Sequence, residues 1–188
     1  MTDLRTQRTN RLIQAAFVKL VNRSGFDTLT VTQIAATALI NRQTFYRHYT
    51  DKFDLAERLA SEAITGFDRA VSERLRIAAD PRHDQEQVLR VVSDIMSTYV
   101  AERIDLLTAL MTLRGDPLDF RDRLQRQIEH RYRQYFADST PDQEDLEIQA
   151  SLFASVALGT LDFILAHKRV PESSRMLRNV QRILTAFV

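Results

Sequence analysis

The 188-residue chain contains no cysteine. Disulfides and thiolate-based metal or redox sites are therefore excluded, and the composition fits a reducing compartment such as the cytoplasm. Its four histidines show neither the His-x-x-x-His nor the Glu-x-x-His spacing that zinc hydrolases and di-iron helical bundles use. We therefore expect no metal site and no cofactor.

Glycine and proline are also scarce, with four residues of each. Both residues interrupt regular structure, so their scarcity favours long helices. The chain shows no sustained alternation of apolar and polar residues, which is the pattern of half-buried strands. Because 44% of the residues are hydrophobic, we predict an all-α protein that buries one substantial core or joins a small domain to a larger one.

Common catalytic motifs and long apolar runs are missing as well. The sequence has no Gly-rich phosphate loop and no Gly-x-Ser-x-Gly elbow, so we do not expect an enzyme. Polar residues interrupt even the most apolar tract, residues 148–166, and the N-terminus is polar where a signal peptide would have an apolar core. We expect a soluble, cytoplasmic protein with no membrane partner.

The formal net charge of +1 conceals an uneven distribution. Residues 1–53 hold eight Lys/Arg against three Asp/Glu, a net charge of +5, and residues 54–188 hold eighteen against twenty-two, a net charge of −4. This asymmetry favours a polyanion-binding segment attached to a body that does not bind polyanions. Ordinary variation in surface charge would account for it equally well.

Residues 30–52, TVTQIAATALINRQTFYRHYTDK, fit two short helices joined by a tight turn. Thr30 and Gln33 form a capping-box pattern at the start of the first helix, and Asn41 is a natural N-cap for the second. Phe45 and Tyr49, four residues apart, share the face that would anchor the second helix. The opposite face is left polar and free, as in a helix-turn-helix that reads DNA.

The remaining apolar periodicity predicts about nine helices in total. A first helix covers residues 5–23, with Gly25 at its left-handed C-terminal cap, and a fourth runs from about residue 51 to 79. Further helices are expected around residues 88–99, 104–113, 120–136, 142–168 and after Pro171. We predict a DNA-binding domain over residues 1–50 and a helical effector-binding and dimerisation domain over residues 51–188.

The last two helices carry more apolar surface than one chain can readily cover. The helix over residues 142–168 is apolar on nearly every face after Ile148, which predicts burial on all sides. We expect a symmetric homodimer through a four-helix bundle, although the same helices would also serve to close a monomer's core. The predicted interface comprises Leu152, Val156, Gly159, Phe163, Met176, Val180, Ile183, Leu184 and Phe187.

The chain resembles the tetracycline-repressor (TetR) family of bacterial transcription regulators. The resemblance is strongest over residues 9–55, and its most specific parts are Thr44-Phe45-Tyr46-Arg47-His48-Tyr49 and Asp51-Lys52-Phe53-Asp54-Leu55. Residues 40–46 further resemble the branch that contains the activator of dihydroxyacetone kinase genes. One departure is Leu39, at a turn position where many relatives carry glycine, so the turn must use a negative φ or accept strain.

The resemblance implies that the second helix of the motif enters the major groove of DNA. There Arg42 would pair with guanine and Gln43 with adenine, and the methyl group of Thr44 would touch thymine. Phosphates would be held by Tyr46, His48 and Lys52 with the hydroxyls of Thr30 and Thr32. Arg47 belongs to the same surface, where it is either a contact or a solvated charge, and His48 is also placed to cap the helix end.

The implied function is that of a repressor that binds an inverted-repeat operator as a homodimer and is released by a small-molecule effector. Two alternatives remain: a DNA-bound activator or co-activator that recruits a partner protein, and a helical carrier or interaction module without specific DNA binding. The residues expected to line an effector pocket, or else simply to fill the core, are Met96, Tyr99, Leu106, Leu110, Met111, Phe120 and Phe153.

Overall fold

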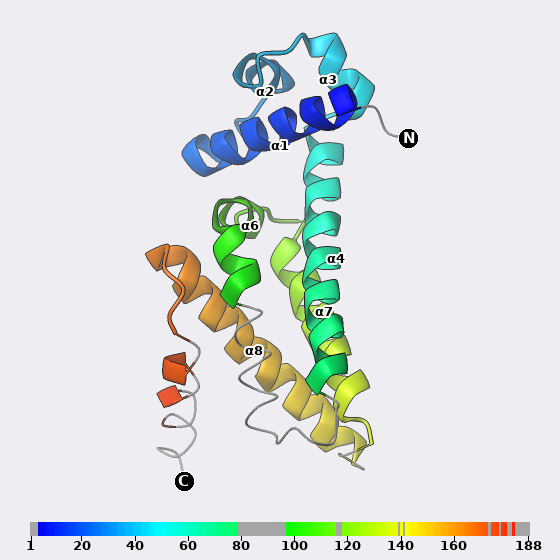
Figure 1. Ribbon diagram of the computed structural model, residues 1–188, viewed down its shortest axis with the longest axis vertical. Helices are drawn as coiled ribbons and strands as arrows, with labels where there is room; N and C mark the ends of the chain where they lie inside the picture. The colour runs from blue at the N-terminus through cyan, green and yellow to red at the C-terminus, as the bar shows by residue number, and fades with distance from the viewer. Residues whose placement is uncertain are drawn as a thin grey trace. The chain divides into compact units, whose positions relative to one another are not determined.

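The computed structural model describes residues 4–78, 97–115, 118–138, 140, 142–172, 174–176, 178–179 and 182, and the side chains of these residues apart from 73–78. This part of the chain contains helices and no strand, which confirms the all-α prediction (Figure 1). The helices are α1 (Leu4–Ser24), α2 (Val31–Thr37), α3 (Arg42–His48), α4 (Lys52–Ala78), α6 (Ile104–Met111), α7 (Phe120–Phe136) and α8 (Gln143–His167). Residues 97–102 and 174–176 are also helical.

The chain packs as two compact units. The first comprises Met1–Ala63 with Asp105–Leu124, and the second comprises Ile64–Ile104 with Gln125–Val188. The division falls inside α4, α6 and α7, so these helices contribute to both units. The predicted border at residue 50, between a DNA-binding domain and an effector-binding and dimerisation domain, stays a prediction.

The first unit has an aromatic and aliphatic core beneath α1, α2 and α3. The side chains of Ile13, Phe17, Ile34, Phe45 and Leu55 are completely buried in it. Ile13 and Phe17 are four residues apart on one face of α1, and α2, α3 and α4 each contribute one of the other three side chains. Burial of these faces therefore holds the short helices α2 and α3, which would be marginal in isolation.

The predicted caps are present at the ends of these short helices. The backbone N–H of Gln33 donates to the Thr30 hydroxyl and the Gln33 side chain accepts from the Thr30 backbone, which completes the capping box. Asn41 Oδ1 accepts from the backbone N–H of Gln43 at 2.8 Å. Gly25 follows α1 with φ of +80°, as its cap position requires.

The turn between α2 and α3 does not use a negative φ at Leu39 but accepts backbone strain. Leu39 has φ of +55° and is 92% exposed. The N–H of Leu39 donates to the Ala36 carbonyl at 3.2 Å and that of Ile40 to the Ala35 carbonyl at 3.0 Å. These two bonds define a Schellman motif, whose left-handed position normally carries glycine.

In the second unit, α4 and α7 are joined by an ion pair between Asp68 and Arg131. Gln127 Nε2 also donates to Asp68 Oδ1, at 2.6 Å. The hydrogen bond from the Arg131 guanidinium is the main cause that lowers the pKa of Asp68 below its ordinary value. Further along α4, Gly66 leaves room for Tyr99, whose hydroxyl would lie 3.0 Å from an added β-carbon.

Helix α8 has one buried face and one exposed face. Its buried residues include Leu146, Ala150, Ala154 and Leu158. The prediction of burial on all sides is wrong for the single chain, because apolar residues remain exposed on the opposite face; they are Ile148, Leu152, Val156 and Phe163. Within the described residues α8 is also long and apolar enough to cross a membrane, although core helices of soluble proteins share that property.

Candidate nucleic-acid interface

Helix α3 separates its anchoring side chains from its polar ones. Phe45 is completely buried and Tyr49, the C-cap residue, is 4% exposed, which confirms their predicted placement. On the other side Arg42, Gln43 and Arg47 are exposed, and Tyr46 is 48% exposed. The free face of α3 therefore offers guanidinium, amide and phenol groups within two helical turns.

Arg42 and Tyr46 lie next to each other on this free face. The Arg42 guanidinium donates to the Tyr46 hydroxyl at 3.2 Å and lies 5.9 Å from the centre of its ring. The contact spans four residues, so both side chains share one side of α3. Tyr46 thus gives the Arg42 guanidinium a hydrogen-bond partner on the free face of α3.

The other predicted DNA contacts are distributed around this face. Thr30 and Thr32 are exposed at the start of α2, whereas Thr44 and His48 on α3 are half-buried. The structure therefore brings all these positions into one unit. The role of each residue toward DNA stays a prediction.

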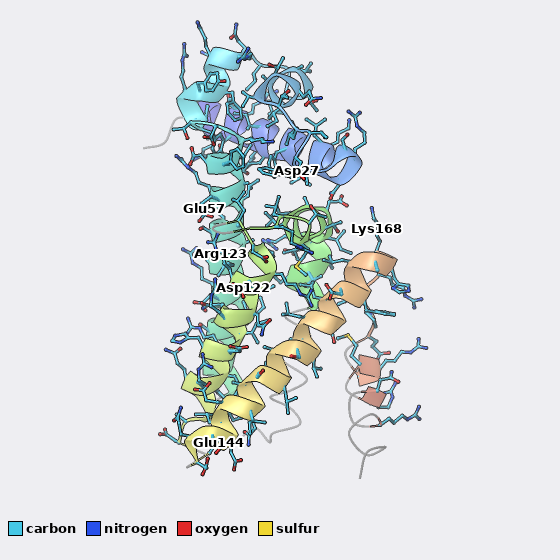
Figure 2. The ribbon with its side chains drawn as sticks, turned by 180° about the vertical axis from the view of Figure 1, so that it is seen from behind. Asp27, Glu57, Asp122, Arg123, Glu144 and Lys168 are labelled. Carbon is cyan, nitrogen blue, oxygen red and sulfur yellow. The ribbon has the colours of Figure 1, made fainter. Side chains whose placement is uncertain are left out.

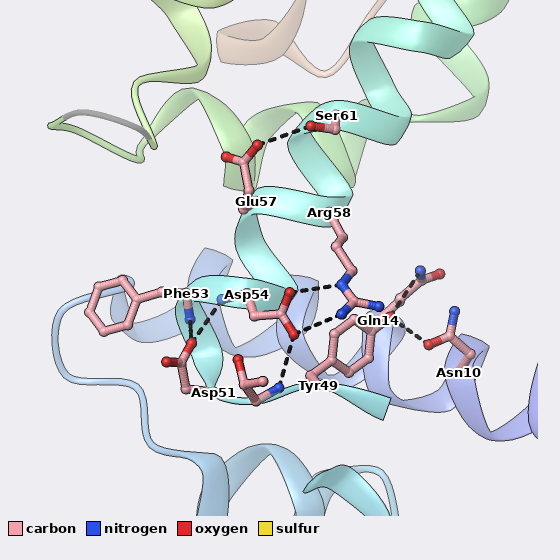
Figure 3. Close-up of polar contacts among 10 residues, drawn as sticks. Asn10, Gln14, Tyr49, Asp51, Phe53, Asp54, Glu57, Arg58 and Ser61 are labelled. Carbon is pink, nitrogen blue, oxygen red and sulfur yellow. Dashed lines mark hydrogen bonds and ion pairs between the residues drawn. The ribbon is translucent and has the colours of Figure 1, made fainter. Parts of the chain in front are cut away.

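A polar cluster fixes the C-terminal end of α3 to α1 and α4 (Figure 3). The Tyr49 hydroxyl donates to Asn10 Oδ1 and receives a bond of 3.4 Å from Gln14 Nε2, both on α1. The Arg58 guanidinium lies over the Tyr49 ring, 5.4 Å from its centre. Burial raises the pKa of Tyr49, so the hydroxyl stays protonated and remains a donor.

The start of α4 is held by two aspartates in the same cluster. Asp51 Oδ1 accepts from the backbone N–H groups of Phe53 and Asp54, each at 2.8 Å, and so caps the helix. Asp54 accepts from the Thr50 N–H at 2.9 Å and pairs with Arg58 at 2.7 Å (Figure 3). Burial acts to raise the pKa of Asp54, but the bonds from Thr50 and Arg58 outweigh it and lower that pKa.

Lys52 has a structural role that the sequence did not reveal. Its ammonium donates to the backbone carbonyls of Phe26 and Asp27, each at 3.0 Å, and lies 4.7 Å from the centre of the Phe26 ring. Two of its three N–H groups are thus used to close the loop between α1 and α2. One donor is left for the predicted phosphate contact.

The first unit also contains a connection that reaches residues far along the chain. Asn22 Nδ2 donates to the Asp105 carbonyl at 2.8 Å. Arg123 donates to Glu57 at 2.6 Å and to the Ser61 hydroxyl at 2.8 Å, and Figure 2 shows Glu57 and Arg123 pointing toward each other. No local pattern marks these partners, because they lie more than sixty residues apart.

Comparison with known proteins places this unit in a family. Residues 12–59, which span α1 to the start of α4, match the family model of bacterial regulatory proteins of the tetR family. Over 125 residues the chain is 30% identical to nucleoid occlusion factor SlmA of Photobacterium profundum, covering 66% of this chain and 60% of that protein. Residues 12–59 form a TetR-family domain.

Solved structures show that the likeness in fold extends over the TetR-family chain as a whole. The dihydroxyacetone kinase operon activator DhaS covers 95% of this chain, and the chain covers 97% of it, with a TM-score of 0.58 and 14% identity. Thermus thermophilus FadR, a repressor solved with lauroyl-CoA, covers 94% of this chain, which covers 93% of it, with a TM-score of 0.58 and 21% identity. The fold is therefore that of a TetR-family transcription regulator. Against SlmA, by contrast, the chain spans about 60% of the relative's length.

The predicted pocket residues fall into both packing units. Leu110, Met111 and Phe120 are buried in the first unit, and Leu106 there is half-buried. Tyr99 is buried in the second unit, where Arg103 lies 4.4 Å from the centre of its ring. Phe153 is 43% exposed against Tyr132, and Met96 lies outside the described residues. The pocket stays a prediction.

The predicted dimer residues on α8 lie on its exposed face. Leu152 is 63% exposed and Phe163 51% exposed, and Val156 and Gly159 lie between them. Met176 is half-buried in the helical residues that follow. Four predicted interface residues lie outside the described part of the chain; they are Val180, Ile183, Leu184 and Phe187.

Among the described residues, no group of three or more metal-ligating side chains is close enough to hold a metal ion. The expectation that the protein uses neither metal nor cofactor stays a prediction.

Proposed function

We propose that this chain is a one-component transcription regulator that binds an inverted-repeat operator as a homodimer. It acts as a cytoplasmic repressor that a small-molecule effector releases from DNA. The observation that carries the proposal is the free face of α3, where exposed Arg42, Gln43, Tyr46 and Arg47 stand on a helix anchored through Phe45 and Tyr49. Arginine and glutamine are the side chains that pair bidentately with guanine and adenine in the major groove.

The exposed stripe on α8 supports the homodimer. Ile148, Leu152, Val156 and Phe163 follow one another at intervals of four, four and seven residues, which places them on one side of the helix, and Gly159 lies between them, where it would allow a second helix to approach closely. A second copy of the same stripe would cover this apolar surface through a two-fold axis. Two copies of α3 would then meet two half-sites in opposite orientation, which requires an inverted repeat.

The connection through Arg123 supports release by an effector. Residues 105–124 pack in the same unit as α3, and the bonds from Arg123 to Glu57 and Ser61 tie them to α4. A ligand that displaces the start of α7 or α6 would therefore also strain the contacts that orient α3. Such a ligand shifts the equilibrium only if it binds the DNA-free conformation more tightly.

Selection of bound duplexes from a random DNA pool tests the central claim. We expect a consensus with two-fold symmetry, and binding that weakens steeply as the salt concentration rises. Failure to enrich any consensus would refute the proposal and favour a carrier or interaction module. A reporter under the selected operator, measured with and without the protein, then distinguishes repression from activation.

Release by an effector is tested on the same operator. Lauroyl-CoA, the ligand held by the Thermus thermophilus relative, is a suitable first probe alongside shorter acyl-CoA molecules and free fatty acids. An active effector lowers operator affinity and, by thermodynamic reciprocity, itself binds less tightly to the DNA complex than to the free protein. Binding of a compound with equal affinity in both states would exclude it as the effector.

A further inference from the structure

Leu39 combines two unfavourable features, a left-handed backbone conformation and an exposed apolar side chain. Its φ of +55° places a branched, non-glycine residue in the left-handed region, where the β-carbon crowds the backbone. Its side chain is 92% exposed, so no packing within the protein compensates for that strain. Strain without an internal compensation is typical of a residue that serves an external contact.

The position of Leu39 limits what that contact can be. It lies in the turn that leads into α3, three residues before Arg42, so the two α-carbons are at most about 11 Å apart. The Schellman bonds of Leu39 and Ile40 to the end of α2 hold the turn in one shape. The leucine side chain is therefore presented at a defined place beside the first turn of the recognition helix.

We propose that Leu39 reads a thymine by packing against its 5-methyl group in the major groove. This inference rests on the proposed DNA-binding function. The N-terminal residues of a recognition helix meet base edges, and the thymine methyl is the apolar group exposed on those edges. An aliphatic side chain beside Arg42 and Gln43 can pack against this methyl group. Leu39 would therefore recognise one base of the half-site in addition to those contacted by α3.

The test replaces each thymine of the selected operator in turn by deoxyuridine, which lacks only the 5-methyl group. For the parent protein we expect one position per half-site, distinct from the thymine that Thr44 is predicted to touch, at which this change weakens binding about three- to fivefold, as the loss of one buried methyl contact predicts. In Leu39→Gly the same position loses its sensitivity, and affinity for the unmodified operator falls by a similar factor. Leu39→Gly should be at least as stable as the parent, so unfolding would not explain weaker binding.

Two variants serve as controls. Thr44→Ser removes the methyl group that is predicted to touch thymine from α3, and its deoxyuridine profile should lose sensitivity at a different position. Leu12→Ala removes an exposed leucine on α1, 44% accessible, and should leave the profile unchanged. Together they separate a contact made by Leu39 from general effects of altering the DNA-binding unit.

Three results would overturn the inference while leaving the proposed function intact. They are a consensus half-site without thymine, identical deoxyuridine profiles for the parent and Leu39→Gly, and a uniform loss of affinity in Leu39→Gly at every operator variant. The last would assign Leu39 to the sugar-phosphate backbone. If the parent enriches no DNA sequence at all, both the inference and the proposed function fail.

Discussion

The backbone of Leu39 makes a stability prediction that is independent of DNA. Leu39→Gly removes the β-carbon from a left-handed position and sacrifices almost no buried surface, so we expect the free energy of unfolding to rise by about 1 kcal/mol. Urea denaturation followed by far-ultraviolet circular dichroism measures this at a fixed protein concentration. Leu39→Ala keeps the β-carbon and should remain close to the parent, whereas equal stability of parent and glycine variant would show that the turn is unstrained.

Arg42 and Lys52 are expected to affect DNA binding in different ways. Arg42→Ala removes a bidentate partner for guanine, so the preference for operator over scrambled DNA should fall by about 1 to 3 kcal/mol. Lys52→Ala should weaken binding to both DNAs alike, because phosphate contacts carry no sequence information. Operator and scrambled-DNA affinities of each variant are compared at one salt concentration. Unchanged selectivity in Arg42→Ala would remove this residue from the base-reading set.

The bonds of Lys52 to the carbonyls of Phe26 and Asp27 add a second consequence to its replacement. Loss of the ammonium leaves the loop between α1 and α2 without these donors, so the variant should also be less stable. Lys52→Arg, which keeps the positive charge, shows how much of the binding loss is electrostatic.

Asp68 makes the stability of the second unit depend on pH. Its pKa in the folded protein is lowered, chiefly by the bond from Arg131, below the ordinary value of 3.8. The ion pair therefore contributes fully above that value, and its contribution is lost as the pH falls through the folded-state pKa. Asp68→Asn should be less stable than the parent at neutral pH, and the difference should shrink in acid.

Chemical denaturation over a pH series measures this difference. Asp138→Asn is the matched control, because Asp138 is exposed and has no ion pair among the described side chains. A constant difference between the parent and Asp68→Asn at all pH values would show that the carboxylate charge contributes nothing.

At the level of the helices, the hydrogen bonds of Tyr49 hold the end of α3 in place. Tyr49→Phe keeps the buried ring but removes the hydroxyl that bonds Asn10 and Gln14 on α1. We expect a loss of about 1 kcal/mol in stability, because Asn10 and Gln14 lose a partner, and weaker operator binding from a less firmly held α3. Urea denaturation and operator titration measure the two effects.

Tyr135→Phe provides the comparison for this prediction, since it deletes a hydroxyl from a tyrosine on α7 that is 36% exposed. Both its stability and its operator affinity should equal those of the parent. If Tyr49→Phe behaved in the same way, the hydrogen bonds at the end of α3 would have no role in presenting it.

For the assembled protein, the exposed face of α8 predicts a change of oligomeric state. Leu152→Glu places a charge in the middle of the apolar stripe, so association of two chains would bury an unpaired carboxylate. We expect the variant to sediment as a monomer with a folded DNA-binding unit and reduced operator affinity. Thr65→Glu adds the same charge at an exposed position on α4 and should remain dimeric. A dimeric Leu152→Glu would move the interface away from this face.

Much of the fold follows from patterns within a few residues of one another. The capping box of Thr30 and Gln33 forms as predicted, Asn41 caps α3 as predicted, and Gly25 has the positive φ that its position after α1 predicts. The prediction that Phe45 and Tyr49 form the anchoring face of α3 is also correct. These features depend on local hydrogen bonds and helical periodicity, which a sequence displays directly.

Other features depended on contacts between residues that are remote in the sequence. Apolar periodicity predicted that α8 is buried on all sides, whereas one of its faces stays exposed in the chain. A charge count could not show that Lys52 bonds to two carbonyls. The ion pair between Arg123 and Glu57 could not be predicted from a local pattern either, because the two residues are far apart in the sequence. Among the described residues, the amino-acid order was sufficient for helices α1 to α4 and α6 to α8, for the caps of α2 and α3 and for the polar face of α3. The strained φ of Leu39, the exposed stripe of α8 and the inclusion of residues 105–124 in the DNA-binding unit required the tertiary fold, because each reflects a balance between local preference and long-range packing.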